Sequence, residues 1–294
     1  MSDTTKIQWA DATWNPWLGC SKVSEGCANC YITSSAPFRV RGLKHGQPRQ
    51  RTSPAYWRQP LRWNKNAIIA GTRPSIFPSL CDWLDDEVPI EWLVDFLKLI
   101  YRTPNLEWLL LTKRPELFAK RIGQTPFDLW DEENPPRNVW LGVSVENQAM
   151  ADKRIQQLRK IPAKIHFLSV EPLLGPVSLL YSTFDGSESF HNMAWIDWVI
   201  LGGESGPNAR PCNIGWIGDV LAECQGANVP CFVKQVGQNP FCDNANMFEW
   251  PEDLELQAAG AAFAACKPLF RDKKGGDPAE WPEDLRVREF PVCR

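Results

Sequence analysis

Short apolar runs rich in β-branched and aromatic residues recur along this chain, and stretches with helical periodicity lie between them. This alternation predicts repeated strand–helix units and therefore a parallel sheet. A first strand is expected just before Cys20. The other predicted strands are 75–80, 107–112, 138–145, 165–170, 196–201 and 229–234, and the predicted helices are 90–101, 115–122, 148–160 and 214–227. The sequence thus predicts an α/β fold, a partial or complete parallel (β/α) barrel of six to seven strands.

The strand–helix rhythm stops near residue 239, and the tail carries Trp-Pro-Glu-Asp twice around a Lys-Lys-Gly-Gly-Asp turn. We expect residues 1–238 to form the barrel, with an N-terminal cysteine loop and a basic insertion at about 31–73. Residues 239–294 are expected to form a small C-terminal appendage packed on it. With 294 residues, 44% of them hydrophobic, the chain can bury a core of that size.

Several classes of protein are excluded by composition. The sequence has no run of 18 or more apolar residues, and the residues from Met1 onward lack the pattern of a signal peptide. Ten cysteines are too few for a disulfide scaffold in a chain of this length. We therefore expect a cytoplasmic protein without membrane contact, in which cysteines serve metal or redox chemistry.

Cys20, Cys27 and Cys30 form a C-x6-C-x2-C motif. Three thiolates in one loop can hold three irons of a cubane cluster and leave the fourth iron open for S-adenosylmethionine. Zinc is the rival, but a structural zinc site wants a fourth ligand, for which His45 and Cys81 are candidates. Uncoordinated cysteines are the third possibility.

Polar residues follow nearly every predicted strand, which is where α/β barrels build their active sites. Cations and carboxylates at these ends can hold phosphate and move protons. The alternative is that they pair into salt bridges across the barrel mouth. Of the histidines, His166 and His191 are expected to be structural. The candidate catalytic residues are Lys113, Arg114, Glu146, Glu171 and Lys234, and the candidate cofactor-binding residues are Ser144, Gly202, Gly203 and Glu204.

The net charge of −3 conceals a strongly basic stretch, because residues 26–81 contain nine Lys and Arg and no Asp or Glu. Aromatic residues lie among these arginines, a combination that is typical of surfaces that bind phosphate and stack bases. A solvated loop is the alternative. The candidate nucleic-acid-binding residues are Arg39, Arg41, Arg49, Arg51, Arg58 and Trp57.

Residues 6–16 (KIQWADATWNP) precede the cysteines, and five further blocks lie downstream. These blocks are LLTKRP at 110–115, NVWLGVSVEN at 138–147, FLSVEPLLG at 167–175, WVILGGESG at 198–206 and FVKQ at 232–235. Together they resemble an uncharacterised, often phage-encoded protein family with a radical-SAM-like N-terminal motif, over about residues 6–237. The resemblance implies a partial barrel with a 4Fe–4S cluster.

Two features depart from ordinary radical-SAM enzymes, which usually show C-x3-C-x2-C. Here the first gap is six residues, and the Gly-Gly-Glu that such enzymes carry early in the barrel stands late, at Gly202, Gly203 and Glu204. These glycines serve either S-adenosylmethionine or a strand-end turn.

The leading expectation is an iron–sulfur, radical-SAM-like enzyme that acts on a nucleotide or nucleic acid and takes electrons from a reductase or other donor. One alternative is a non-catalytic nucleic-acid-binding protein with a structural zinc or iron–sulfur site. The other alternative is a barrel hydrolase that needs no metal. The sequence does not indicate the oligomeric state.

Overall fold

The structure is a computed structural model. It describes residues 5–126, 130, 135–182, 189–190, 193–258 and 265–292, so His191 and part of the predicted appendage lie outside the described residues. The chain forms two compact units. The first comprises Met1–Val143 and Gln156–His166, and the second comprises Ser144–Ile155 and Phe167–Arg294. The predicted domain boundary at 238 stays a prediction.

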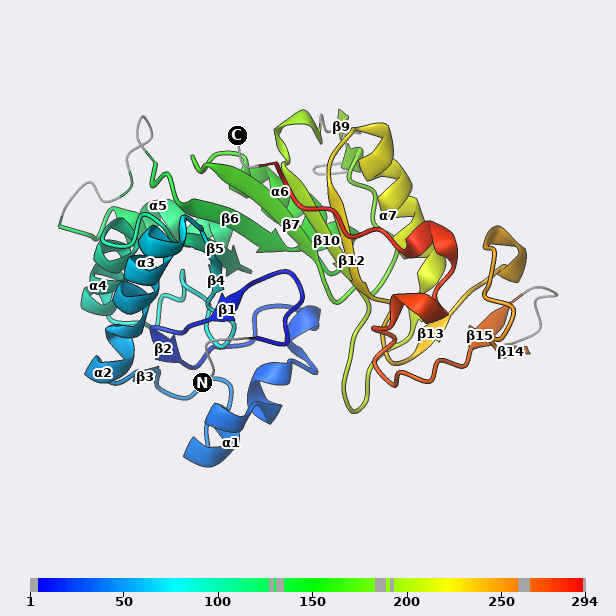
Figure 1. Ribbon diagram of the computed structural model, residues 1–294, viewed down its shortest axis with the longest axis horizontal. Coiled ribbons are helices and arrows are strands. Elements are labelled where there is room, and N and C mark those ends of the chain that lie inside the picture. Colours follow the sequence, from blue (N-terminus) through cyan, green and yellow to red (C-terminus); the bar gives the residue numbers. More distant parts are fainter. Residues whose placement is uncertain are drawn as a thin grey trace. The chain divides into compact units, whose positions relative to one another are not determined.

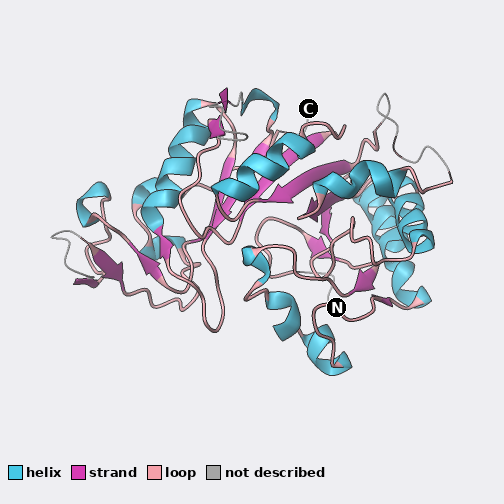
Figure 2. Ribbon diagram, turned by 180° about the vertical axis from the view of Figure 1, so that it is seen from behind, coloured by secondary structure: helices cyan, strands magenta, loops and turns pink. Residues whose placement is uncertain are grey.

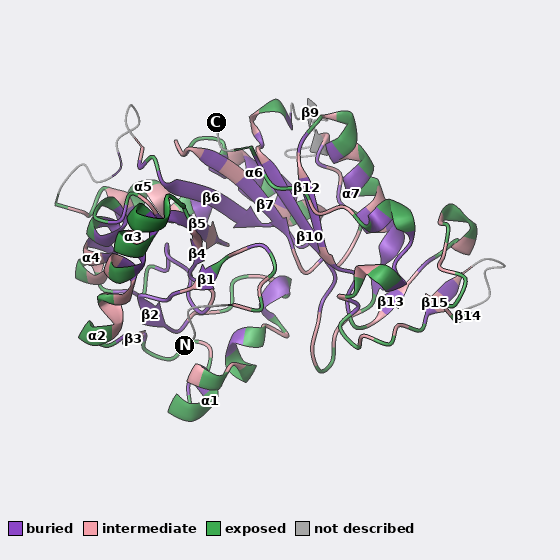
Figure 3. Ribbon diagram, in the orientation of Figure 1, coloured by how far each residue is buried: buried purple, intermediate pink, exposed green. Residues whose placement is uncertain are grey.

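Parallel strands form the centre of the first unit, in the order β1 (Ala12–Thr13), β4 (Ser75–Phe77), β5 (Glu107–Thr112) and β6 (Val139–Ser144). Every residue of β6 is buried, as are all but one of β5, which Figure 3 shows in purple. Continuous apolar runs are typical of parallel strands that are covered on both faces.

Helices of the first unit follow from apolar periodicity. Helix α4 (Ile90–Tyr101) has the predicted bounds, because Pro89 sets its start and its buried side recurs every three to four residues. Figure 1 places α4 beside α3 (Gln59–Ala70). The other helices here are α1 (Ala36–Arg41), α2 (Pro54–Trp57) and α5 (Phe118–Ile122), with 3-10 turns η1 (Glu25–Cys27), η2 (Tyr31–Ser34) and η3 (Pro115–Leu117).

An aromatic cluster fixes the N-terminal segment to the sheet and to α4. The rings of Trp14 and Trp108 lie 5.6 Å apart, and Phe96 contacts both at 5.9 and 5.4 Å. Trp17 reaches the same Phe96 at 6.0 Å. Such pairs contribute beyond the area that they bury. The residues that precede the cysteine loop therefore belong to the core.

The second unit contains β7 (Ile165–Val170), β10 (Trp198–Gly202) and β12 (Cys231–Gln235), again parallel. Helix α7 (Ile214–Gly226) begins at Asn213, whose side chain accepts a hydrogen bond from the Gly215 amide. The unit also holds most of helix α6 (Gln148–Leu158). Figure 2 distinguishes the helices from the strands.

Short elements follow β12. They are β13 (Pro240–Phe241), which pairs with β11 (Cys212–Asn213), and the hairpin of β14 (Leu256–Ala258) and β15 (Cys266–Pro268). Two further groups of short elements belong to this unit. The antiparallel strand pair is β8 (Tyr181–Ser182) with β9 (Ser189–Phe190), and the 3-10 turns are η5 (Met193–Trp195), η6 (Ala245–Met247), η7 (Pro278–Glu280) and η8 (Glu283–Leu285). The final segment runs antiparallel along β12, where the Val233 amide donates to Val287 and the Glu289 amide to Cys231.

The main sheet has seven strands in the order β1-β4-β5-β6-β7-β10-β12. The predicted α/β fold with a partial parallel barrel is thereby confirmed, and the separate C-terminal appendage stays a prediction. Strands β5 and β7 and helix α4 have the predicted bounds, and η3 with α5 covers the predicted helix 115–122. The other predicted strands and helices differ by a few residues at their ends. Within the described residues, no helix has the length and apolar character needed to cross a membrane.

One strand prediction needs correction. The segment just before Cys20 is β2 (Trp17–Leu18), which pairs antiparallel with β3 (Gln50–Arg51) outside the main sheet, whereas the first strand of the sheet is β1. Pro16 separates the two, and a proline has no amide to continue a ladder.

Candidate functional site

The three cysteines lie in one loop of the first unit that begins where β2 ends. Gly19 forms a parallel bridge with Cys81 and has φ of +120°. A Cβ atom at Gly19 would lie 2.8 Å from Cδ of Arg49, so only glycine fits this position without displacing that side chain. Cys20 is consequently held between the segment that leads into β3 and the turn after β4.

The rest of the loop is built from turns. Cys27 ends η1 and is buried, while Cys30 precedes η2 and is half-buried. The Lys22 ammonium donates to the Ala28 carbonyl at 3.0 Å, and the Tyr31 hydroxyl donates to the Ser79 carbonyl at 2.7 Å. Cys20 and Cys30 both pack against one apolar cluster. Its members are Leu18, Ile32, Phe38, Leu43 and Leu80.

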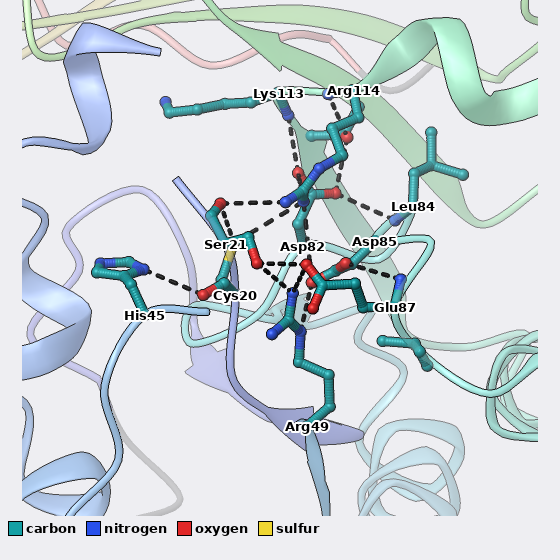
Figure 4. A network of polar contacts seen from close by, with 12 residues as sticks. Cys20, Ser21, His45, Arg49, Asp82, Leu84, Asp85, Glu87, Lys113 and Arg114 are labelled. Carbon is teal, nitrogen blue, oxygen red and sulfur yellow. Dashed lines mark hydrogen bonds and ion pairs between the residues drawn. The ribbon is translucent and has the colours of Figure 1, made fainter. Parts of the chain in front are cut away.

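Arg114 joins Cys20 to the carboxylates that follow β4 (Figure 4). Its guanidinium donates to Sγ of Cys20 at 3.8 Å and to the Ser21 carbonyl at 3.0 Å. It lies 3.3 Å from Asp82 and 3.9 Å from Asp85. Burial lowers the pKa of Arg114, but Asp82, Cys20 and Asp85 together raise it above its usual value. One buried cation thus serves two carboxylates and one thiol.

Arg49 is the second cation of this network, and its side chain is fully buried. It donates to Asp85 at 2.7 Å and to the Ser21 hydroxyl at 2.8 Å, and it lies 2.9 Å from Glu87. The Ser21 hydroxyl in turn donates to Glu87. Arg49 therefore belongs to the scaffold of the cysteine loop, although the sequence suggested a nucleic-acid contact.

The end of β5 positions Asp82. The Thr112 hydroxyl donates to Oδ1 of Asp82 at 2.7 Å and the Leu84 amide donates to the same oxygen at 3.1 Å, while the Lys113 amide donates to Oδ2 at 3.0 Å. The predicted residues Lys113 and Arg114 thus stand at a strand end beside the cysteine loop, as Figure 4 shows. Sequence position after a parallel strand was sufficient to place them.

Burial and nearby charges act in opposite directions on the thiols. Burial raises the pKa of Cys20 to about 12, Asp82 raises it as well, and Arg114 opposes both. Burial also raises the pKa of Cys30, against the lowering effect of Lys113 and Lys22. Metal or cluster binding must therefore displace protons from these thiols, and the cations stabilise the thiolates that result.

The donor set fits a thiolate-bound metal or cluster in its chemistry. The described residues include no group of three or more His, Cys, Asp or Glu side chains that is already arranged to hold a metal ion. Both fourth-ligand candidates lie near Cys20, since Nδ1 of His45 is 3.1 Å from the Cys20 carbonyl oxygen and Cys81 forms a bridge with the preceding residue, Gly19. Burial, Asp82 and Cys20 all raise the pKa of Cys81. Nε2 of His45 is buried and makes no hydrogen bond to the described residues. Metal-ligating histidines typically anchor one ring nitrogen in this way.

In the second unit, the predicted strand-end acids are paired with cations. Glu146 and Arg154 are both buried and lie 2.6 Å apart, and Arg154 also donates to the Ser144 carbonyl at 2.8 Å. Glu171 and Lys234 form a half-buried pair at 2.7 Å. These residues therefore form salt bridges, which was the alternative to a catalytic role considered from the sequence.

The late Gly-Gly-Glu is also engaged within the second unit. Arg210 binds Glu204 through two guanidinium nitrogens, at 2.6 and 3.0 Å, and through its own amide at 2.8 Å. A Cβ atom on Gly202 would lie 2.9 Å from Glu171, and one on Gly203 would overlap the Val236 carbonyl. These glycines permit close packing of β10 against its neighbours.

The remaining nucleic-acid candidates separate into two exposed places. Arg39 and Arg41 lie on α1, where Arg41 donates to Gln50 at 3.3 Å. Arg51 lies on β3, pairs with Asp95 at 2.6 Å and places its guanidinium 4.4 Å from the ring centroid of Trp57. Arg58 follows Trp57. Only the second place combines arginines with an aromatic face.

Sequence reasoning missed Ser21, Asp85 and Glu87. These residues lie in loops, so no strand end or motif identified them. One signal was available, because a run of acids at 82–87 begins directly where the acid-free basic stretch ends. The structure pairs two members of that run with Arg49 from the basic stretch.

Comparison with known proteins gives one match. The sequence model of a family described as "Protein of unknown function (DUF5131)" matches residues 4–266. A search of curated proteins and a search of solved structures found no match.

Proposed function

We propose that this chain, which belongs to the DUF5131 family of proteins of unknown function, is an iron–sulfur enzyme of the radical-SAM type that acts on a nucleotide or nucleic-acid substrate. The observation that carries the proposal is the cysteine loop, in which the buried Arg114 donates to Sγ of Cys20, and Lys113 and Lys22 act electrostatically on Cys30. Cys20, Cys27 and Cys30 are the residues that would hold the cluster.

The surroundings of the loop suit a cluster that carries negative charge. Arg114 donates to Sγ of Cys20, and Lys113 and Lys22 act electrostatically on Cys30. Hydrogen bonds to cluster sulfurs and nearby cations tune reduction potential and favour thiolate ligands. Arg114 therefore orients Cys20, and the carboxylates Asp82 and Asp85 hold Arg114 in place.

Bound there, a 4Fe–4S cluster with one iron free of protein ligands supplies one-electron cleavage of the sulfonium–C5′ bond of S-adenosylmethionine, which yields methionine and a 5′-deoxyadenosyl radical that abstracts hydrogen from the substrate. The electron comes from a reductase or another low-potential donor. Gly202, Gly203, Glu204 and Ser144 stay candidates for contacts with S-adenosylmethionine, and Glu146, Glu171 and Lys234 for catalysis.

The test is anaerobic purification of the full chain, followed by iron and sulfide analysis and by incubation with S-adenosylmethionine and a strong reductant. We expect a brown protein with about four irons per chain, as one cubane requires, and release of 5′-deoxyadenosine. Cys27→Ala and Cys30→Ala should lose the iron. Cys224→Ala, a buried cysteine of α7, is the matched control and should keep it. Iron retained by Cys27→Ala and Cys30→Ala would refute the proposal.

A structural zinc site is the second candidate, because His45 offers a buried ring nitrogen without a hydrogen bond in the described residues and Cys81 lies beside Cys20. With either residue added, the set reaches the four ligands of a closed zinc site. A colourless protein with one zinc per chain, lost in His45→Ala or Cys81→Ala, would favour this candidate over the enzyme.

A further inference from the structure

A cavity of about 650 Å³ opens on the first unit between β3, α2 and the start of α3 on one side and the second half of α4 on the other. Its size lies within the range of ordinary small-molecule sites. Trp57 and Leu61 face it from α2 and α3, and Leu99 and Tyr101 face it from α4. Within the described residues it is separate from the cysteine network, with which it shares no lining residue.

The cavity is lined by four cationic side chains and one carboxylate. Asp95 is paired with Arg51 at 2.6 Å, so its charge is already offset. Arg58, Lys98 and Arg102 contribute the remaining positive charge and are exposed to solvent. Exposed cations that converge on a concave surface bind phosphate.

A flat aromatic surface lies beside these cations. The Arg51 guanidinium is stacked over the Trp57 ring at 4.4 Å, and Trp14 supports that ring from the core with an edge contact at 5.2 Å. Indole rings and guanidinium planes are the surfaces on which nucleic-acid bases stack. Phosphate-binding and base-stacking groups therefore stand on one wall.

A second hollow of about 510 Å³ adjoins the first through the shared residue Arg58 and contains Arg62. Arginines therefore line both hollows, as the successive phosphates of a strand would require.

A short ladder connects this cavity to the cysteine loop. Arg51 of β3 pairs with Trp17 of β2, and Gln50 pairs with Leu18, two residues before Cys20. Arg49, at the other end of the same segment, donates to Ser21. Alternate residues of a strand are about 7 Å apart, so one segment contacts both places.

We propose that this cavity binds a nucleoside phosphate, with the base stacked on the guanidinium of Arg51, which Trp57 supports, and the phosphate held by Arg58 and Arg102. This rests on the proposed function, in that the bound nucleotide is the substrate that the cysteine loop serves. The nucleotide enters as part of a single strand or as a free molecule, and the two sources share this chemistry.

The test measures fluorescence anisotropy of a labelled single-stranded oligonucleotide with the full chain, at several salt concentrations, with adenosine monophosphate and inorganic phosphate as competitors. Arg58→Gln/Arg102→Gln should weaken binding about tenfold and reduce the salt slope by about 1.4, which corresponds to two lost phosphate contacts. Trp57→Leu should weaken binding of the oligonucleotide but not competition by inorganic phosphate.

Arg137→Gln/Lys160→Gln is the matched control, because it removes the same charge from exposed positions of the first unit, outside the cavity. Its affinity should change less than about threefold. Equal losses in the two double variants would overturn the proposal. Competition by the mononucleotide as strong as that by unlabelled oligonucleotide identifies the free nucleotide as the ligand, and weaker competition identifies the strand.

Two further measurements separate this inference from the proposed function. Binding by Cys27→Ala/Cys30→Ala should equal that of the wild type, since the cavity contains neither cysteine. Iron in Arg58→Gln/Arg102→Gln should also be unchanged. If the wild type contains no iron but binds the oligonucleotide, only the iron–sulfur enzyme proposal is refuted. If the protein contains iron but binds neither the oligonucleotide nor the mononucleotide, only the cavity proposal is refuted.

Discussion

The polar groups of the two units are organised differently. Around the cysteine loop each cation is shared, since Arg114 serves Asp82, Asp85 and Cys20, and Arg49 serves Asp85 and Glu87. In the second unit the acids singled out by sequence form ion pairs, namely Glu146 with Arg154, Glu204 with Arg210 and Glu171 with Lys234. Such ion pairs hold a chain in place, whereas a network that includes thiols also contains groups that can ligate a metal. We therefore expect chemistry in the first unit.

The largest effect is expected at Arg114. Arg114→Met leaves Asp82 and the Cys20 sulfur without their shared donor, which should cost about 5 kcal/mol of unfolding free energy in urea and lower the iron content. Arg121→Met is the control, because this buried arginine donates to a backbone carbonyl, that of Val88. It should cost about 1–2 kcal/mol and leave the iron unchanged. Similar losses in both variants would contradict the special role of Arg114.

A double-mutant cycle tests whether Glu146 and Arg154 contribute to stability mainly through their interaction with each other. Glu146→Gln alone should cost about 3 kcal/mol, because Arg154 stays buried without its carboxylate. Adding Arg154→Met should recover most of this loss. The corresponding double variant of the network, Asp82→Asn/Arg114→Met, should recover little, since Cys20 and Ser21 still lose their donor. Equal recovery of unfolding free energy in the two cycles would contradict the proposed difference between the ion pair of the second unit and the network of the first.

Gly19→Ala should cost about 2 kcal/mol, because alanine is strained at φ of +120° and its Cβ atom would press on Arg49. Gly226→Ala, at the end of α7, meets open space and should stabilise the protein by about 0.5 kcal/mol. Thermal unfolding measures both. A neutral Gly19→Ala would mean that Cys20 is not held as tightly as described.

The smallest effect is expected for the half-buried pair Glu171–Lys234. Lys234→Met should cost less than about 1 kcal/mol, because solvent screens a pair of this exposure. Turnover measured on the same variant has a separate meaning. Loss of 5′-deoxyadenosine release at unchanged stability would support a catalytic role for this pair.

Much of the fold could be predicted because burial on both faces leaves a strong pattern. Strand β5 and helix α4 were predicted at their observed bounds, since one is a continuous apolar run and the other an apolar stripe behind a proline. Strand β1 has two residues, too few for any periodicity, and was therefore missed.

In the candidate site, too, local sequence patterns predict some features and tertiary contacts determine the others. The placement of Lys113 and Arg114 at a strand end could be predicted because they follow a buried strand, whereas the ligand role of the three cysteines stays a prediction. The roles of Arg49 and Asp85 could not, since they depend on a contact between residues 36 positions apart in two loops. Only the tertiary structure determines which cation of a basic segment turns inward.

The final segment along β12 has a consequence for self-association. An open sheet ends in a strand with unpaired amides and carbonyls, which is a template for pairing with another molecule. Residues 287–289 take these hydrogen bonds, and Arg288 is seated between the rings of Phe232 and Trp281, 5.4 Å from each. Residues 287–289 thus cover the edge strand β12, and removing them should expose this strand to pairing with another molecule.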